Sequence, residues 1–123
     1  MRWLVDGMNV IGTRPDGWWN DRRGAMERLA QLLSDFASRS GEEVTVVFDG
    51  EPFDLSAEVE VVFAPGGPDA ADGEIVRIVS SLARPGSATV VSSDRRLVER
   101  TQALGAEVMG ANTFRRRLEE SAP

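Results

Sequence analysis

Acidic residues follow the apolar runs of this sequence at separate places along the chain. Asp6 and Asp49 each end an apolar run directly before a glycine, and Asp94 follows a further run and a Ser-Ser pair. Asp72 stands at the start of a helical pattern. Carboxylate oxygens are the ligands that hard cations such as Mg²⁺ and Mn²⁺ prefer. If these four side chains meet, we expect them to form an oxygen-lined metal site.

The residue types that are missing narrow the chemistry further. The sequence has no Cys and no His, and all 14 basic residues are Arg. Disulfides, thiolate nucleophiles, imidazole bases, Cys/His zinc sites and lysine-based sites are therefore excluded. Carboxylate and hydroxyl chemistry remains, with Arg as the only permanent cation.

Three of these acids also have an ordinary structural explanation. Asp49-Gly50 is a common turn pair, Asp94 suits a helix N-cap, and Asp72 would complement a helix dipole. As a group they are costly, because two unit charges roughly 4 Å apart repel by about 4 kcal/mol near a protein surface. A bound dication would offset this repulsion. Raised pKa values or nearby Arg would also offset it, and the sequence leaves these alternatives open.

Apolar patterning predicts the elements that position these acids. Five apolar runs predict buried strands, and they span residues 3–5, 44–48, 59–64, 88–91 and 107–109. Helical spacing predicts the segments between them, at residues 26–36, 75–82 and 97–104, with a last helix over 113–120. Buried strands alternating with helices indicate an α/β fold: a central parallel sheet of about five strands with helices on both faces.

The topology of such a sheet predicts where the acids lie. Right-handed crossovers place the first strand centrally, with the second and third strands on one side and the fourth and fifth on the other. Ligands of open parallel sheets bind beyond the carboxyl ends of the strands, where the strand order reverses. We expect the four carboxylates at this edge. We also expect one domain over residues 1–120 and a tail over 121–123.

Four stretches, in this order, resemble the motifs of NYN-domain, YacP-like proteins of the PIN-like ribonuclease superfamily. They are residues 4–12 (LVDGMNVIG), 47–50 (VFDG), 71–75 (ADGEI) and 91–94 (VSSD). The resemblance extends from Leu4 to about Phe114. It implies a three-layer, Rossmann-like (PIN-like) fold and Mg²⁺- or Mn²⁺-dependent cleavage of RNA.

The resemblance also implies roles for single residues. Asp6, Asp72 and Asp94 match metal-binding acids, and Asp49 matches a further acid at the site. All four are expected to be catalytic and to bind one or two ions, which orient a water for in-line attack on a phosphodiester. Asn9 matches a polar neighbour of these acids.

A loop rich in tryptophan and arginine, residues 13–23, follows the first motif. Aromatic faces stack on unpaired bases and Arg pairs with phosphates, so this loop is expected to hold single-stranded RNA. One of its two tryptophans is instead expected to cover the core. The residues expected to contact substrate are Asn9, Ser92, Ser93, Arg14, Arg95, Trp18 and Trp19. The Arg115–Arg117 run is expected to be a solvated helix face.

Two other functions fit parts of the sequence. Met8 and Val76 depart from the family pattern, and the net charge of −6 opposes binding to a polyanion. These features favour a non-catalytic RNA- or protein-binding module with the same fold. A phosphoacceptor or phosphatase domain is disfavoured, because there is no Lys and Met8 stands where a second Asp would be needed.

The chain is expected to be soluble and cytoplasmic, without a membrane partner. No apolar run approaches the roughly 20 residues of a membrane span, and Asp6 interrupts the N-terminal run too early for a secretion signal. RNA is the expected partner. Whether a ribosome delivers this RNA, and whether the chain forms a homodimer, stays open.

Overall fold

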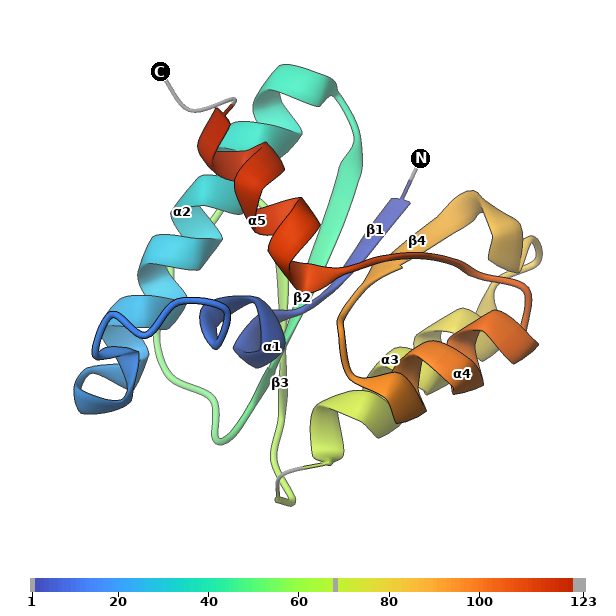
Figure 1. The fold of residues 1–123 in the computed structure, drawn as a ribbon, viewed down its shortest axis with the longest axis horizontal. Helices are drawn as coiled ribbons and strands as arrows, with labels where there is room; N and C mark the ends of the chain where they lie inside the picture. The colour runs from blue at the N-terminus through green and yellow to red at the C-terminus, as the bar shows by residue number, and fades with distance from the viewer. Residues whose placement is uncertain (1, 68, 121–123) are drawn as a thin grey trace.

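The computed structural model describes residues 2–67 and 69–120, in which a parallel sheet has helices on both faces (Figure 1). The strands lie in the order β3-β2-β1-β4-β5, and every neighbouring pair is parallel. They are β1 (Arg2–Asp6), β2 (Glu43–Asp49), β3 (Glu60–Ala64), β4 (Ala88–Val91) and β5 (Glu107–Met109). The expected fold class and strand order are confirmed.

Within the described residues, five α-helices and two 3₁₀ turns connect and cover these strands. The helices are α1 (Gly7–Ile11), α2 (Arg22–Ser40), α3 (Ala70–Ser81), α4 (Arg95–Ala103) and α5 (Ala111–Glu120). The 3₁₀ turns are η1 (Trp18–Asn20) and η2 (Pro85–Ser87). Helix α1 was not predicted, because five residues are too few to show a helical period. The tail expected over residues 121–123 lies outside the described part of the chain.

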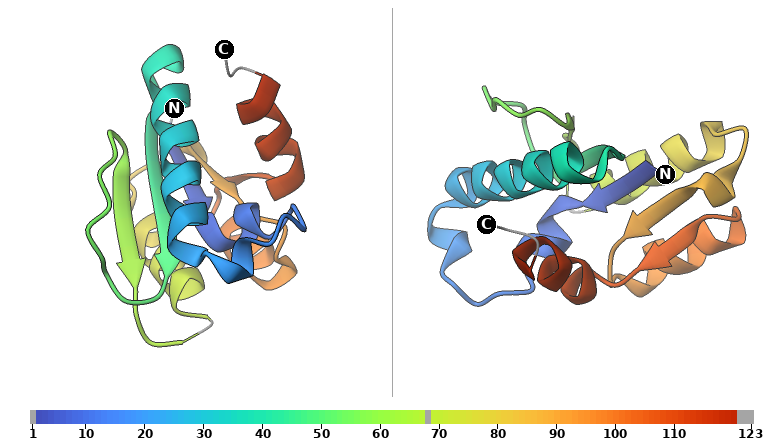
Figure 2. Two further views of the ribbon diagram at one scale, coloured as in Figure 1. Left: turned by 90° about the vertical axis from the view of Figure 1, so that its left-hand side faces the viewer. Right: turned by 90° about the horizontal axis from the view of Figure 1, so that it is seen from above.

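The core is divided between the two faces of the sheet. Side chains alternate along β1, so Trp3 and Val5 join one buried cluster and Leu4 joins the other. The first cluster packs α1, α2 and α5 against the sheet, and Figure 2 shows α2 and α5 side by side there. The second cluster packs α3 and α4 on the opposite face. Both faces of the sheet are thus covered by helices.

Local signals set the two ends of α2, which begins within residues 13–23, the segment that we call the aromatic loop. Asp21 caps the start of α2 by accepting a hydrogen bond from the Gly24 N–H at 3.1 Å. Gly41 ends the helix with a φ of 71°, a left-handed conformation that glycine adopts without strain. Within residues 2–67 and 69–120, no helix combines the length and apolar character that a membrane span requires.

Candidate active site

Four acids lie beyond the carboxyl ends of the central strands, and we call this group the acidic edge. Asp6 ends β1, and Asp49 ends β2. Asp94 is the N-cap of α4 just after β4, while Asp72 lies in the first turn of α3. The charges of Asp72, Asp49 and Asp94 all act on the carboxyl of Asp6. The structure thus places the four predicted carboxylates at the same edge of the sheet.

Asp6 is the buried member of the acidic edge, with only 5% of its surface exposed. Burial, reinforced by repulsion from the other three acids, raises the pKa of Asp6 to about 7. The Ser92 hydroxyl donates a hydrogen bond to Asp6 Oδ2 at 2.9 Å and partly opposes this rise. Without a bound cation, this carboxyl would therefore be about half protonated near neutral pH.

Asp49 holds the start of α3 as well as contributing charge. Its Oδ1 accepts a hydrogen bond from the Ala71 N–H at 2.9 Å. Burial raises the pKa of Asp49, whereas this hydrogen bond and the nearby Arg22 guanidinium lower it. Arg22 Nη2 donates a hydrogen bond to the Asp49 carbonyl oxygen at 3.3 Å. The start of α2 therefore places a cation directly beside the acidic edge.

Asp72 is half-buried and its pKa is also raised. Burial is the main cause, and repulsion from Asp94, Asp69 and Asp49 adds to it. Arg100 opposes the rise. Asp69 is a fifth acid that the sequence analysis missed, although its place one helical turn before Asp72 was a usable signal. Arg22 lies in the loop of residues 13–23 that was expected to hold RNA, whereas Arg100, on α4 after Asp94, was missed.

Hydrogen bonds join the polar residues that were predicted to contact substrate. Ser92 Oγ donates to Asp6 and accepts from the Asp94 N–H at 3.0 Å. The Ser93 N–H donates to Asn9 Oδ1 at 2.8 Å, which fastens the turn after β4 to α1. The structure places Asn9, Ser92 and Ser93 at the acidic edge, where they support the acids. Their contact with substrate stays a prediction.

Close packing against β2 explains why a glycine, Gly7, follows Asp6. A Cβ atom at this position would overlap the ring of Phe48, which is fully buried in β2. It would also come within 3.1 Å of Val46 Cγ2. The absence of a side chain therefore lets α1 begin directly against β2, which holds Asp6 and Asp49 at the same edge.

The two tryptophans of the aromatic loop have different environments. Trp18 is half-buried and packs against the core, which confirms that one of the pair covers it. Trp19 is 58% exposed and meets the Trp18 ring edge-on, with the ring centroids 5.9 Å apart. Arg14 forms an ion pair with Glu119 of α5. Arg95 is exposed beside Asp94. The roles of these residues in RNA binding stay predictions.

The expectation of a solvated Arg115–Arg117 face was wrong for Arg115. Only 16% of the Arg115 side chain is exposed. Its guanidinium lies 4.0 Å from Asp16, and its Nη1 donates a hydrogen bond to the Val10 carbonyl oxygen at 3.4 Å. The burial follows from a contact between α5 and the aromatic loop, which sequence spacing cannot show.

The donor set of the acidic edge fits a hard divalent cation in its chemistry. All its side-chain donors are oxygens, and one of them belongs to a buried carboxyl whose charged form is disfavoured. Across the described residues, no three acidic side chains are spaced to hold an ion by themselves. Mg²⁺ usually keeps several waters and uses one or two carboxylates together with substrate phosphates. The edge matches this open kind of binding.

Comparisons with known proteins agree on one family. The profile of the YacP-like NYN domain matches residues 3–122. The crystal structure of Rae1 (YacP) from Bacillus subtilis is similar, with 28% identity and a TM-score of 0.81 over 98% of this chain and 74% of that chain. A point mutant of Rae1 gives 29% identity and a TM-score of 0.82 over 97% and 75% of the two chains. No curated protein matched the sequence.

Proposed function

The chain belongs to the YacP-like NYN domain family, and from this membership we propose that it is a metal-dependent ribonuclease acting at the acidic edge. One observation supports this proposal most strongly. Asp6 is buried among the charges of three other acids, an arrangement that opposes ionisation and that a cation would relieve. The proposed substrate is single-stranded RNA, because Trp18 lines a pocket together with Asp49, and the exposed Trp19 contacts Trp18.

The residues proposed to hold Mg²⁺ or Mn²⁺ are Asp6, Asp72, Asp94 and Asp49. When bound, the cation supplies an activated water for in-line attack and stabilises the departing oxygen, so that no histidine is needed. Ser92 keeps the Asp6 carboxylate in one orientation through its hydrogen bond to Oδ2. Asp49 and Asp94 each use Oδ1 to accept backbone hydrogen bonds, which fixes their side chains at the edge.

Cations next to the acidic edge are proposed to receive the phosphate. Arg22 contacts the backbone of Asp49, and Arg95 begins α4 beside Asp94. Because the net charge of the chain is −6, such local cations matter more than the overall charge for holding a polyanion.

A binding module without turnover is the second candidate function. It is favoured by the finding that, among the described residues, no three acids are spaced to hold an ion by themselves. Such a module would bind RNA through the same loop and edge, and metal would not change the RNA. The two candidates differ in a single observable, which is whether labelled RNA becomes shorter.

A cleavage assay separates them. End-labelled single-stranded RNA is incubated with the protein and Mn²⁺ or Mg²⁺, with a chelator control. The Asp94→Asn variant keeps an N-cap residue for α4 and should lose cleavage, since it removes one carboxylate charge from the edge. Asp54→Asn, at an exposed acid outside the edge, is the matched control and should cleave normally.

Two results would contradict the ribonuclease. Binding of RNA by the wild-type protein without metal-dependent shortening would support the binding module. Equal cleavage by wild type and Asp94→Asn would remove Asp94 from the site, even if the chain is a nuclease.

A further inference from the structure

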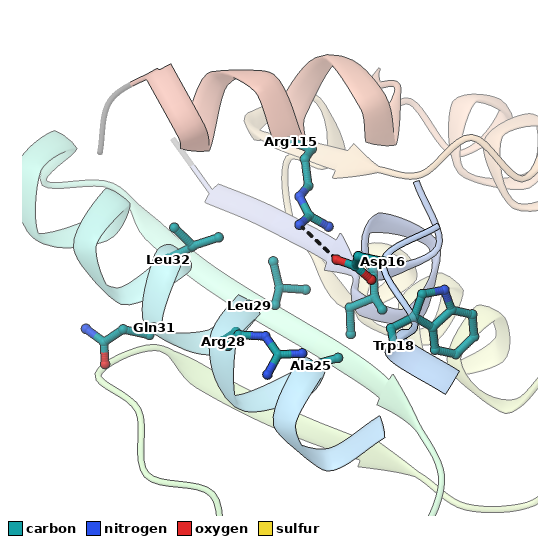
Figure 3. Close-up of a pocket in the computed structure, with 9 residues that line it drawn as sticks. Asp16, Trp18, Ala25, Arg28, Leu29, Gln31, Leu32 and Arg115 are labelled. Carbon is teal, nitrogen blue, oxygen red and sulfur yellow. Dashed lines mark ion pairs between the residues drawn. The ribbon is translucent and has the colours of Figure 1, made fainter. Parts of the chain in front are cut away.

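A second surface feature lies on the other side of the aromatic loop from the acidic edge. A pocket of about 330 Å³ is enclosed by α2, α5 and the loop between α1 and α2 (Figure 3). We call it the Trp18 pocket. Ile11, Leu29 and Leu32 give it an apolar interior, and the Trp18 ring forms one wall. Its volume is in the range that holds small ligands.

The Trp18 pocket adjoins the proposed active site. Trp18 also lines a separate pocket of about 340 Å³, together with Met8, Arg22 and Asp49. One aromatic side chain thus separates the Trp18 pocket from a cavity that reaches the acidic edge.

The cations of the Trp18 pocket are of two kinds. Arg115 reaches across from α5 toward Asp16, as Figure 3 shows, and it also contacts Glu119 at 3.7 Å. These acids compensate its charge. Arg28 is exposed on α2 and forms no ion pair with any residue in the described ranges 2–67 and 69–120. The pocket therefore combines an apolar interior, an aromatic wall and one uncompensated cation at its rim.

These three features match the chemistry of a nucleotide. A base has apolar faces that stack on an aromatic ring, and its phosphate pairs with a guanidinium. An aliphatic side chain of a protein partner would fill the interior, but it would leave Arg28 without a counter-charge.

We propose that the Trp18 pocket binds one unpaired base of the RNA strand, stacked against Trp18, with the adjacent phosphate at Arg28. This inference rests on the proposed function and names a substrate subsite for it. The pocket fixes which nucleotide of the strand lies at the acidic edge. It therefore acts on the affinity and register of the RNA and leaves the chemical step unchanged.

The test uses a fluorescein-labelled heptameric single-stranded RNA, with binding measured by anisotropy in the presence of a chelator so that no cleavage occurs. Leu32→Trp fills the pocket from a half-buried position on α2, and Arg28→Ala removes the rim cation. Ser38→Trp, on the same helix, and Arg84→Ala, on the turn before β4, are matched controls at exposed positions. Melting curves check that each variant is folded.

Leu32→Trp should weaken RNA binding about tenfold, the size of a lost base-stacking contact. Arg28→Ala should weaken binding several-fold and lower the salt dependence by about one phosphate contact. A series of heptamers with a single abasic nucleotide should show one position at which the base matters, and this sensitivity should vanish in Leu32→Trp. Both controls should bind like the wild type.

Each contrary outcome overturns the inference in a recognisable way. Equal RNA affinity of wild type, Leu32→Trp and Arg28→Ala would end the subsite but leave a ribonuclease that still cleaves. An oligomeric state changed by Leu32→Trp, with RNA affinity unchanged, would show that the pocket holds a second copy of the chain. A wild-type protein that neither binds nor cleaves RNA would end the proposed function and the subsite together.

Discussion

The acidic edge and the Trp18 pocket lie on either side of the same loop, yet different forces hold them in place. At the acidic edge the backbone sets the positions of the acids. Asp6 and Asp49 end paired strands, and backbone N–H groups donate hydrogen bonds to Asp49 and Asp94. Around the Trp18 pocket, contacts between side chains hold the segments in place. Arg14 pairs with Glu119, and Arg115 with Asp16, across about a hundred residues of chain.

The two regions also treat charge in opposite ways. The sheet holds acids in partly buried positions at the acidic edge, and burial, with repulsion from nearby acids added to it, raises the pKa values of Asp6, Asp49 and Asp72. Around the Trp18 pocket the long side chains can rotate, so opposite charges meet and Arg115 is compensated. A rigid scaffold can therefore keep like charges close together, whereas flexible side chains would move them apart. Functional clusters of like charge are accordingly expected on rigid elements.

The largest expected effect is the loss of stability that accompanies ionisation of Asp6. Asp6 binds a proton more tightly in the folded protein, with a pKa of about 7, than at its ordinary value of 3.8. Its contribution to stability is complete below about pH 4 and is lost as the pH rises through 7, by about 4 kcal/mol in total. In chelator, urea unfolding should therefore show that Asp6→Asn gains this amount over wild type between pH 4 and pH 8.

Mn²⁺ should reverse that comparison at pH 8. It should raise the melting temperature of the wild type, because a ligand that binds the folded state stabilises it. Asp6→Asn should respond far less, and Asp54→Asn should behave like the wild type. Parallel pH profiles for wild type and Asp6→Asn would mean that the acidic edge carries no electrostatic cost.

Packing at the acidic edge gives the second effect. Gly7 and Gly73 each follow an acid of the edge within a helix, but only Gly7 faces a buried ring. Gly7→Ala should destabilise the protein by about 1–3 kcal/mol through overpacking against Phe48. No neighbour lies within 4 Å of a Cβ atom at Gly73, so Gly73→Ala should be neutral or stabilise by about 0.4–1 kcal/mol. Urea denaturation measures both, and equal values would refute the packing explanation.

The sequence predicted the acidic edge for the same reason that the edge is rigid. Apolar runs locate the strands, crossover handedness orders them, and the residues after the strands must then share one edge. Asp6, Asp49 and Asp94 could therefore be placed without coordinates. Asp69, the N-cap residue of α3, was overlooked, although it lies one helical turn before Asp72.

The Trp18 pocket could not be predicted in this way. Its walls come from α2, α5 and the loop between α1 and α2, and no local pattern says that these segments meet. The solvated face expected for Arg115 was a reasonable inference from helical charge, but the contact with Asp16 overrides it. Trp18 and Trp19 were recognised as a pair, and their different burial depends on the unpredicted turn η1.

One helix cap in each region can be removed at a similar cost in stability, which allows the two regions to be compared. Asp94 caps α4 by accepting hydrogen bonds from the Arg96 and Leu97 N–H groups, and Asp21 caps α2, the helix that lines the Trp18 pocket. Replacing either by Ala should cost about 1 kcal/mol in urea denaturation. Only Asp94→Ala should also reduce the stabilisation by Mn²⁺, because only Asp94 belongs to the acidic edge. If Asp21→Ala lowered the Mn²⁺ response equally, the metal effect would be a general consequence of lost stability.

The smallest effect concerns the ion pair between Arg14 and Glu119, whose side chains are 44% and 40% exposed. Exposed pairs contribute roughly 0.2–1 kcal/mol and weaken in salt, so Glu119→Gln should lower stability by less than about 1 kcal/mol, and by less still in 1 M salt. A double-mutant cycle with Arg14→Gln isolates the pair. Since Arg115 also bonds Val10 and Trp18 packs on the core, losing one pair leaves the loop anchored. A coupling above about 2 kcal/mol would instead show that this pair holds the loop as firmly as backbone hydrogen bonds hold the acidic edge, and the contrast between the two regions would fail.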